Sequence, residues 1–298
     1  MRDLKQFSAG EWLRFAPFEY AFKQVRNDAG LAIYKGFRPK SLELFLKATE
    51  RFRDRNIALV VAFEQPWALD WLLRMAQRNL VDTDVLVFDN SRRAAARIEI
   101  ERVCRHRGAP YLALPANPTR HVNRSHGMAM TWIFHNVVRA VKPRLFAFID
   151  HDLIPVEKTD LSERLGGQPF FGKPRISAWG WQLWAGYCLF DFSTVAGLPL
   201  NFLYDFSRKL DTGGRNWDCL YRNHDRERVR FADSRYVDVR DPGTGETRPV
   251  EIVDDRWFHI GSIGYNENFG SKATFCEGLA EAMDRGVLWP QLCGEVKS

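Results

Sequence analysis

The chain has 298 residues, of which 45% are hydrophobic and 13% aromatic, enough for one large globular domain or two modest ones. The formal net charge is +6 and the isoelectric point is near 9.1, which would suit nucleic acid, an anionic membrane surface or an anionic small substrate. Because Lys and Arg are mixed with Asp and Glu along most of the sequence, charge alone selects no partner, and we expect no nucleic-acid partner.

The cysteines and the apolar runs indicate the compartment. The five cysteines include no CxxC pair, so neither a disulfide framework nor a zinc knuckle is indicated. The first residues, MRDLKQFSAGEWLRF, lack the apolar core of a signal peptide, and no stretch approaches the roughly 20 apolar residues of a membrane span. We expect a cytoplasmic protein, with peripheral contact at the inner membrane face as an open alternative.

Residues 1–55 mix aromatic with basic residues and contain helix breakers such as Pro17 and Pro39. One interpretation is an extension that packs on the main domain, and the other is an amphipathic segment that touches a membrane.

From Asn56 onward, short apolar runs alternate with helix-length amphipathic segments. This alternation is typical of a parallel sheet covered by helices on both faces. The predicted strands are 57–63, 84–88, 110–115 and 144–149, and the predicted helices are 67–80, 92–108 and one that contains residues 130–141.

The second half has a different pattern. Residues 168–192 are rich in aromatics and glycine, and residues 229–253 predict strands around the turn DPGTGE, 241–246. We expect residues 56–156 to form a nucleotide-binding half and residues 157–298 an acceptor-binding half of one continuous domain.

Polar residues follow three of the predicted strands, at Glu64, at Asp89 and Asn90, and at Asp150 to Asp152. In open α/β sheets, ligands bind where the carboxyl ends of the strands meet, so these residues could line one crevice. Asp150 and Asp152 are two apart, which in extended backbone places both side chains on one side, and such oxygen ligands suit Mg²⁺ or Mn²⁺ on a diphosphate. A solvated turn or a helix N-cap at Asp152 is the alternative.

The run from Ile57 to Val156 resembles the nucleotide-sugar-dependent glycosyltransferases of the GT-A fold, in particular the family 2-like group. The resemblance is carried in order by IALVVAFEQ, VLVFDNS, NRSHGMAMTWIFHNVV and FAFIDHD, the last containing a DxD motif. It implies a mixed, mostly parallel, Rossmann-related α/β sheet flanked by helices, with an acceptor half rich in strands and loops. It also implies a nucleotide-sugar donor, with a UDP-sugar favoured over a GDP-sugar.

The resemblance implies roles for particular residues of the first half. Ala62 and Glu64 would line the pocket for the donor base, and Asp89, with Asn90 after it, would contact the base or ribose. Asp150 would contact the ribose or the metal, and Asp152 would bind the metal.

The third metal ligand in this fold is often a histidine far down the chain, and His259 is the candidate; a structural histidine is the alternative. Gly261 and Gly264, which follow it, could let backbone approach phosphate. Gly264 lies outside the residues that the structure describes. In the loop before the helix, Arg120 and His126 could contact a diphosphate, although Arg120 could simply be solvated.

The acceptor half offers aromatic and acidic candidates. Three tryptophans lie close together in the sequence, at 179, 181 and 184, and we expect one of them to stack on a sugar. Trp181 and Trp184 are the candidates for substrate binding. Packing in the core is the alternative for each of them. An inverting transfer needs a general base, for which Asp211 is the first candidate and Asp191 the alternative. Asp211 could instead be an Asx-turn carboxylate that bonds its own backbone.

These predictions combine into a metal-dependent glycosyltransferase that uses Mn²⁺ or Mg²⁺ and transfers a sugar to a hydroxyl of a glycan, a lipid-linked acceptor or a small molecule. One alternative is a nucleotidyltransferase acting on a sugar phosphate, although AFEQPW after the first strand lacks the Gly-rich basic loop expected there. The second alternative is a carbohydrate-binding protein without catalytic activity. This alternative would leave the strand-end carboxylates without a function.

Overall fold

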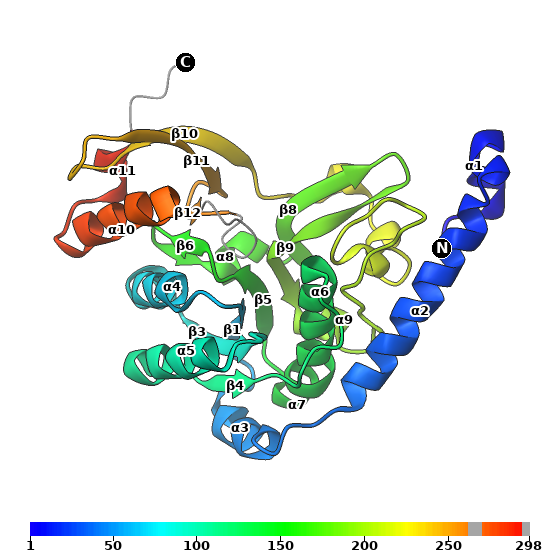
Figure 1. Ribbon diagram of the computed structural model, residues 1–298, viewed down its shortest axis with the longest axis horizontal. Helices are drawn as coiled ribbons and strands as arrows, with labels where there is room; N and C mark the ends of the chain where they lie inside the picture. Colours follow the sequence, from blue (N-terminus) through cyan, green and yellow to red (C-terminus); the bar gives the residue numbers. More distant parts are fainter. Residues whose placement is uncertain (262–269, 294–298) are drawn as a thin grey trace.

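The computed structural model describes residues 1–261 and 270–293. Its central sheet has six strands in the order β4-β3-β1-β5-β9-β8 (Figure 1). The strands β4, β3, β1 and β5 run parallel, whereas β9 is antiparallel to both β5 and β8. Their bounds are β1 Asn56–Ala62, β3 Thr83–Asp89, β4 Tyr111–Ala113, β5 Leu145–Asp150, β8 Phe170–Ser177 and β9 Gly180–Asp191. The predicted α/β fold with a mostly parallel sheet is confirmed.

Strand β1 shows why this sheet forms the centre of the molecule. All seven of its residues are buried, and alternate side chains enter two different apolar cores. Ile57, Leu59 and Val61 belong to one core, and the residues between them belong to the other. A strand with both faces buried needs a continuous apolar sequence, which is the pattern of IALVVA.

Helices cover both faces of the sheet (Figure 1). Side chains of α4 (Pro66–Asn79), α5 (Ala94–Arg107) and α10 (Gly270–Asp284) fill one core. The other core is filled from the N-terminal helices and from a long helical segment that includes one π-helical stretch. These elements are α2 Ala16–Gly36, α3 Leu42–Thr49, α6 Val122–Ile133, η3 Phe134–Val138 and α7 Arg139–Val141.

The chain leaves the central sheet directly after Asp150. Residues 151 and 152 form a turn, and β6 (Leu153–Pro155) joins a second sheet in the order β10-β11-β12-β6. The expectation of extended backbone through Asp152 is therefore wrong, because the chain must turn there to change sheets. In the second sheet His259 pairs with Leu153, so the distant histidine comes beside the turn.

The second sheet contains the hairpin predicted around DPGTGE. Its strands are β10 Ser234–Arg240, β11 Thr247–Val253 and β12 Trp257–His259. The remaining elements are short: α1 Ala9–Leu13, β2 Leu80–Val81, β7 Thr159–Asp160, α8 Leu161–Leu165, α9 Phe192–Val195, α11 Trp289–Leu292, and the 3₁₀ turns η1 Leu4–Gln6, η2 Glu50–Phe52, η4 Gly214–Trp217, η5 Tyr221–Asn223 and η6 Arg226–Arg228. None of the described helices combines the length and the apolar character needed to cross a membrane.

Candidate active site at the carboxyl ends of the parallel strands

The carboxyl ends of β1, β3 and β5 lie next to one another. Ala62 at the end of β1 is in register with Asp89 at the end of β3, and Val61 is in register with Asp150 at the end of β5. The chain passes from β1 outward to β3 and β4 and then returns to the other side of β1 with β5. This reversal is the topological switch point, where open α/β sheets hold their ligands.

Asp89 ends β3 beside β1, and Asn90 follows it directly. The fully buried Asp89 carboxylate accepts hydrogen bonds from the Ser91 backbone N–H at 2.8 Å and from the Tyr111 hydroxyl at 2.9 Å. The Asn90 amide donates to Ser125 Oγ at 2.9 Å, and its backbone N–H donates to the Ala62 carbonyl at 2.9 Å. The predicted donor-side residues are thus brought together, and their hydrogen bonds hold the strand ends rigidly.

Glu64 has a left-handed backbone conformation, with φ of 60°. Its carboxylate accepts hydrogen bonds from the backbone N–H groups of Arg92 and Arg93 at 2.7 and 3.0 Å, and it also contacts the Arg93 guanidinium. Burial alone would raise the pKa of Glu64, but these hydrogen bonds outweigh it and lower that pKa. Glu64 therefore secures the segment that leads into α5, a structural task that sequence reasoning did not foresee.

Asp150 faces His126, the α6 residue predicted to contact substrate. His126 Nε2 lies 3.5 Å from Asp150 Oδ1, and the two side chains are only 22% and 24% exposed. Burial, followed by the negative charge of Asp152, raises the pKa of Asp150 to about 7. Burial lowers the pKa of His126 to about 4 despite the neighbouring carboxylates, so His126 is neutral at pH 7 and the contact is no salt bridge.

The two carboxylates of the DxD motif lack hydrogen-bond donors. No side chain or backbone N–H in the described parts of the chain donates a hydrogen bond to Asp150 or Asp152. The Asp152 side chain is only 9% exposed, and its Oδ2 atom lies 3.9 Å from His259 Nε2. His151 lies between Asp150 and Asp152 in the sequence, and its Nε2 atom is buried without a hydrogen-bond partner among the described residues. Burying carboxylates without hydrogen-bond donors costs folding free energy unless a cation compensates their negative charge.

His259 is held in a fixed orientation by Glu251. The distance from His259 Nδ1 to Glu251 Oε2 is 2.7 Å, and the Lys173 ammonium contacts the other oxygen of Glu251. Burial alone would lower the pKa of His259, but the hydrogen bond to Glu251 and the charge of Asp152 outweigh it and raise that pKa. With Nδ1 bonded to a carboxylate, Nε2 is the ring nitrogen that faces Asp152, as in histidines that bind metals.

The predicted ligands Asp150, Asp152 and His259 do not form a closed metal cage. Within residues 1–261 and 270–293, no three His, Cys, Asp or Glu side chains are placed closely enough to hold a metal ion. Mg²⁺ is commonly bound by one or two carboxylates while substrate phosphates and water supply the other ligands. The donor set therefore fits a hard cation held jointly with a phosphorylated substrate, and it does not fit a structural metal site.

A pocket of about 440 Å³ opens beside Asp150. It is walled by α6, by β8 and β9, and by the loop that follows residue 208. Its lining residues are Asn123, His126, Asp150, Arg175, Ile176, Gln182, Trp184, Ala185, Lys209, Leu210, Asp211 and Thr212. The pocket is of a size that suits a small ligand, and it carries both charged groups and one aromatic face.

The two predicted tryptophans have different surroundings. Trp184 lines the pocket, and its ring centroid lies 4.9 Å from that of His259. Trp181 is 5% exposed and packs in the core against Phe170 and Tyr221. The assignment of Trp181 to substrate is therefore corrected: its ring points into the core and does not line the pocket.

Gly186 is the residue that lets Trp184 and Asp150 approach each other. A Cβ atom at this position would overlap both the Trp184 ring and the Asp150 carboxylate. Only glycine fits here without a shift of one of those side chains.

The structure separates the two candidates for the general base. Asp211 lines the same pocket as Asp150, and one of its carboxylate oxygens accepts a hydrogen bond from the Thr212 N–H at 2.8 Å. Asp191 pairs with Leu145 at the opposite end of β5, where it caps α9 by accepting from the Thr194 N–H. Asp191 is therefore too far along the strand to act at Asp150. The prediction of Asp191 as the alternative general base is wrong.

Several residues of the pocket and of the His259 environment were not singled out from the sequence. Arg175 and Lys209 add positive charge to its lining, and Glu251 and Lys173 orient His259. The alternation of Lys173 and Arg175 in the sequence was a usable signal for those two residues, whereas nothing local marks Lys209 or Glu251. The predicted Arg120 is exposed on the loop before α6.

No protein-family model matches the sequence, and no curated protein sequence matches it. Among solved structures, the chain is similar to glucosyl-3-phosphoglycerate synthase from Mycobacterium tuberculosis in complex with Mn²⁺ and UDP-glucose, with 17% identity and a TM-score of 0.29 over 46% of this chain and 49% of that one. It is also similar to the mannosyltransferase PcManGT from Pyrobaculum calidifontis in complex with GDP-mannose and Mn²⁺, with 10% identity and a TM-score of 0.35 over 58% of this chain and 55% of that one. The chain spans about half the length of these solved structures, so the functional assignment rests on the site itself.

Proposed function

We propose that this protein is a glycosyltransferase that takes a sugar from a nucleotide diphosphate sugar and transfers it to a hydroxyl group, with Mn²⁺ or Mg²⁺ as its cofactor. The observation that supports this most strongly is the pair of carboxylates at the topological switch point. Asp150 and Asp152 lack hydrogen-bond donors in the described structure, and His259 presents Nε2 to Asp152. Anionic oxygens placed there fit a divalent cation bridging a diphosphate.

In this proposal, Asp152 and His259 hold the metal, with Asp150 beside them. When bound, the metal would neutralise the negative charge that develops on the departing nucleotide diphosphate. Glu251 keeps His259 in the orientation that exposes Nε2, and Lys173 keeps Glu251 in place.

The donor nucleotide would lie over the ends of β1 and β3. Asp89 and Asn90 would contact its base or ribose, and Ala62 and Glu64 would line the base pocket. A UDP-sugar is favoured over a GDP-sugar by the resemblance to the GT-A family. Arg120 and the basic lining residues Arg175 and Lys209 would add positive charge for the diphosphate or for an anionic acceptor.

The acceptor would occupy the pocket between Asp150 and Asp211. Trp184 offers an aromatic face for a sugar ring, and Asp211 offers a carboxylate in the same cavity. In an inverting reaction Asp211 accepts the proton of the acceptor hydroxyl as its oxygen attacks the anomeric carbon, and the bond to the diphosphate breaks.

Nucleotide-dependent stabilisation tests the proposal. In the presence of Mn²⁺, UDP is expected to raise the melting temperature by about 5 °C at roughly a hundredfold excess over its Kd, because a ligand that binds only the folded state stabilises it. GDP and CMP serve as alternative nucleotides, and each is measured with and without Mn²⁺ by thermal shift.

The outcomes separate the alternatives. Stabilisation by free sugars alone, without any nucleotide effect, would contradict the proposal and support a carbohydrate-binding protein. Stabilisation by a nucleoside triphosphate and a sugar phosphate together, and not by UDP with Mn²⁺, would support a nucleotidyltransferase.

A further inference from the structure

Helix α2 packs one side against the protein and exposes an apolar row on the opposite side. Leu31 and Tyr34 are buried against the body of the protein together with Gln24 and Asn27. With 3.6 residues per turn, the opposite side presents Phe18, Phe22, Val25 and Ile33, and Phe15 lies just before the helix begins. We call Phe15, Phe18, Phe22, Val25 and Ile33 the apolar stripe.

Every residue of the apolar stripe is exposed. The exposed fractions are 68% for Phe15, 62% for Phe18, 69% for Phe22, 67% for Val25 and 65% for Ile33. The neighbouring Leu13 in α1 is 82% exposed. Exposed apolar residues scattered singly are ordinary, but a continuous row of this kind on one helix marks an interaction surface.

The charge around the apolar stripe is positive. Residues 1–55 contain twelve Lys and Arg but seven Asp and Glu, so they carry five of the six net positive charges of the chain. Among the acidic residues here, Glu11 pairs with Arg2, Glu19 with Lys23, and Asp28 with Arg215.

Three arginines near the stripe have no such partner. Arg14, Arg26 and Arg38 are exposed, and none of them forms an ion pair with a residue in the described parts of the chain. Their guanidinium groups are therefore available to external anions.

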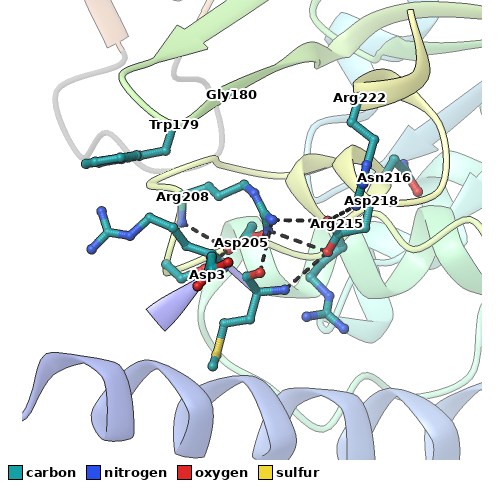
Figure 2. Close-up of polar contacts among 12 residues, drawn as sticks. Asp3, Trp179, Gly180, Asp205, Arg208, Arg215, Asn216, Asp218 and Arg222 are labelled. Carbon is teal, nitrogen blue, oxygen red and sulfur yellow. Dashed lines mark hydrogen bonds and ion pairs between the residues drawn. The ribbon is translucent and has the colours of Figure 1, made fainter. Parts of the chain in front are cut away.

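The N-terminal segment is fixed to the body of the protein (Figure 2). The Met1 ammonium lies 3.2 Å from Asp218, and the Arg2 N–H donates to Ser207 Oγ at 2.8 Å. Arg208 donates to the Met1 carbonyl at 3.0 Å while it pairs with Asp205. The apolar stripe is thus presented on a supported helix, and the loop that supports it continues directly into Lys209 and Asp211 of the pocket.

We infer that the apolar stripe docks on a lipid membrane that contains anionic lipids. Helix α2 would lie in the plane of the membrane surface, with its phenylalanines among the upper acyl chains and with Arg14, Arg26 and Arg38 on headgroup phosphates. A second copy of the chain fits less well, because a symmetric pairing of the stripes would bring two positively charged segments together. This inference does not depend on the proposed transferase activity.

Flotation with vesicles tests this inference. The full chain is expected to bind phosphatidylcholine vesicles that contain phosphatidylglycerol and to bind much more weakly to phosphatidylcholine alone. The F18S/F22S double variant should bind at least about tenfold more weakly, since it loses two apolar side chains from the contact. R14Q/R26Q should lose the preference for anionic vesicles and keep the weak binding to neutral ones.

Ile98→Ser is the matched control, because Ile98 is 64% exposed on α5, away from the stripe. It is expected to bind anionic vesicles as the wild type does, and circular dichroism melting of all variants checks that they fold. The inference is overturned if the wild type does not bind anionic vesicles, or if F18S/F22S binds them unchanged. It is equally overturned if the wild type is a dimer in solution that F18S/F22S converts to a monomer, which would place a second copy on the stripe.

Discussion

Asp152→Asn is expected to lower the rate of metal-dependent sugar transfer by about 10² to 10³-fold. The amide keeps the shape of the side chain and removes the negative charge. Asp152 is buried and its carboxylate faces Nε2 of His259, so the variant loses a negative charge at the point where the metal would bind. The measurement is the release of UDP from a UDP-sugar at increasing Mn²⁺ concentrations, with donor hydrolysis as the readout if no acceptor is known.

Asp255→Asn is the control for this variant. Asp255 is 70% exposed in its side chain and pairs with Arg235 on the surface, so its loss should leave the rate unchanged. Melting curves of both variants distinguish a catalytic loss from unfolding. Full activity of Asp152→Asn, or full activity of the wild type in excess chelator, would mean that the DxD motif holds no catalytic metal.

The second large effect is expected at Gly186. Gly186→Ala places a Cβ atom where the Trp184 ring and the Asp150 carboxylate now lie, so one of them must move. Such a clash costs about 1–3 kcal/mol of folding free energy. Because a displacement of about 1 Å in a reacting group can cost about 10²-fold in rate, transfer should fall by about that factor even in the folded variant.

Gly197→Ala is the matched substitution, since a Cβ atom there has no neighbour within 4 Å. It should change neither the rate nor the unfolding free energy by a measurable amount. If folded Gly186→Ala transfers sugar at the wild-type rate, the close approach of Trp184 to Asp150 has no part in catalysis.

The first half of the fold could be predicted because its signals are local. The run IALVVA is apolar on both faces, and it is a central strand with both faces buried. The helix predicted for 92–108 is observed as α5, Ala94–Arg107, because its pattern persists for several turns, and it is followed by Gly108 in the left-handed conformation that glycine adopts readily. Strand-end carboxylates could likewise be found by their position alone.

The acceptor side depended on long-range pairing that the sequence does not display. Strand β9 runs antiparallel to β5, so Asp191 at its carboxyl end lies at the amino end of β5. A prediction that assumed continued parallel strands would place it at the crevice. Trp181 and Trp184 lie on different faces of β9, and only the neighbouring strands decide that one face is core.

The orientation of His259 could not be predicted either. It depends on Glu251 in the adjacent strand of an antiparallel pair, with Glu251 in register opposite His259. The turn at residues 151–152 is a further case, because the run FAFIDHDLIP carries no proline or glycine at the point where the chain changes sheets. In each case the tertiary partner, and not the local pattern, sets the geometry.

The most direct test of a divalent cation at the DxD carboxylates is a crystal structure with UDP and Mn²⁺, in which anomalous scattering locates the manganese. We expect one manganese peak in contact with the Asp152 carboxylate, close to Asp150 and His259 and bonded to diphosphate oxygens, with the uridine over the ends of β1 and β3. A nucleotide bound elsewhere, or bound at this crevice with no manganese at Asp150 and Asp152, would contradict this expectation.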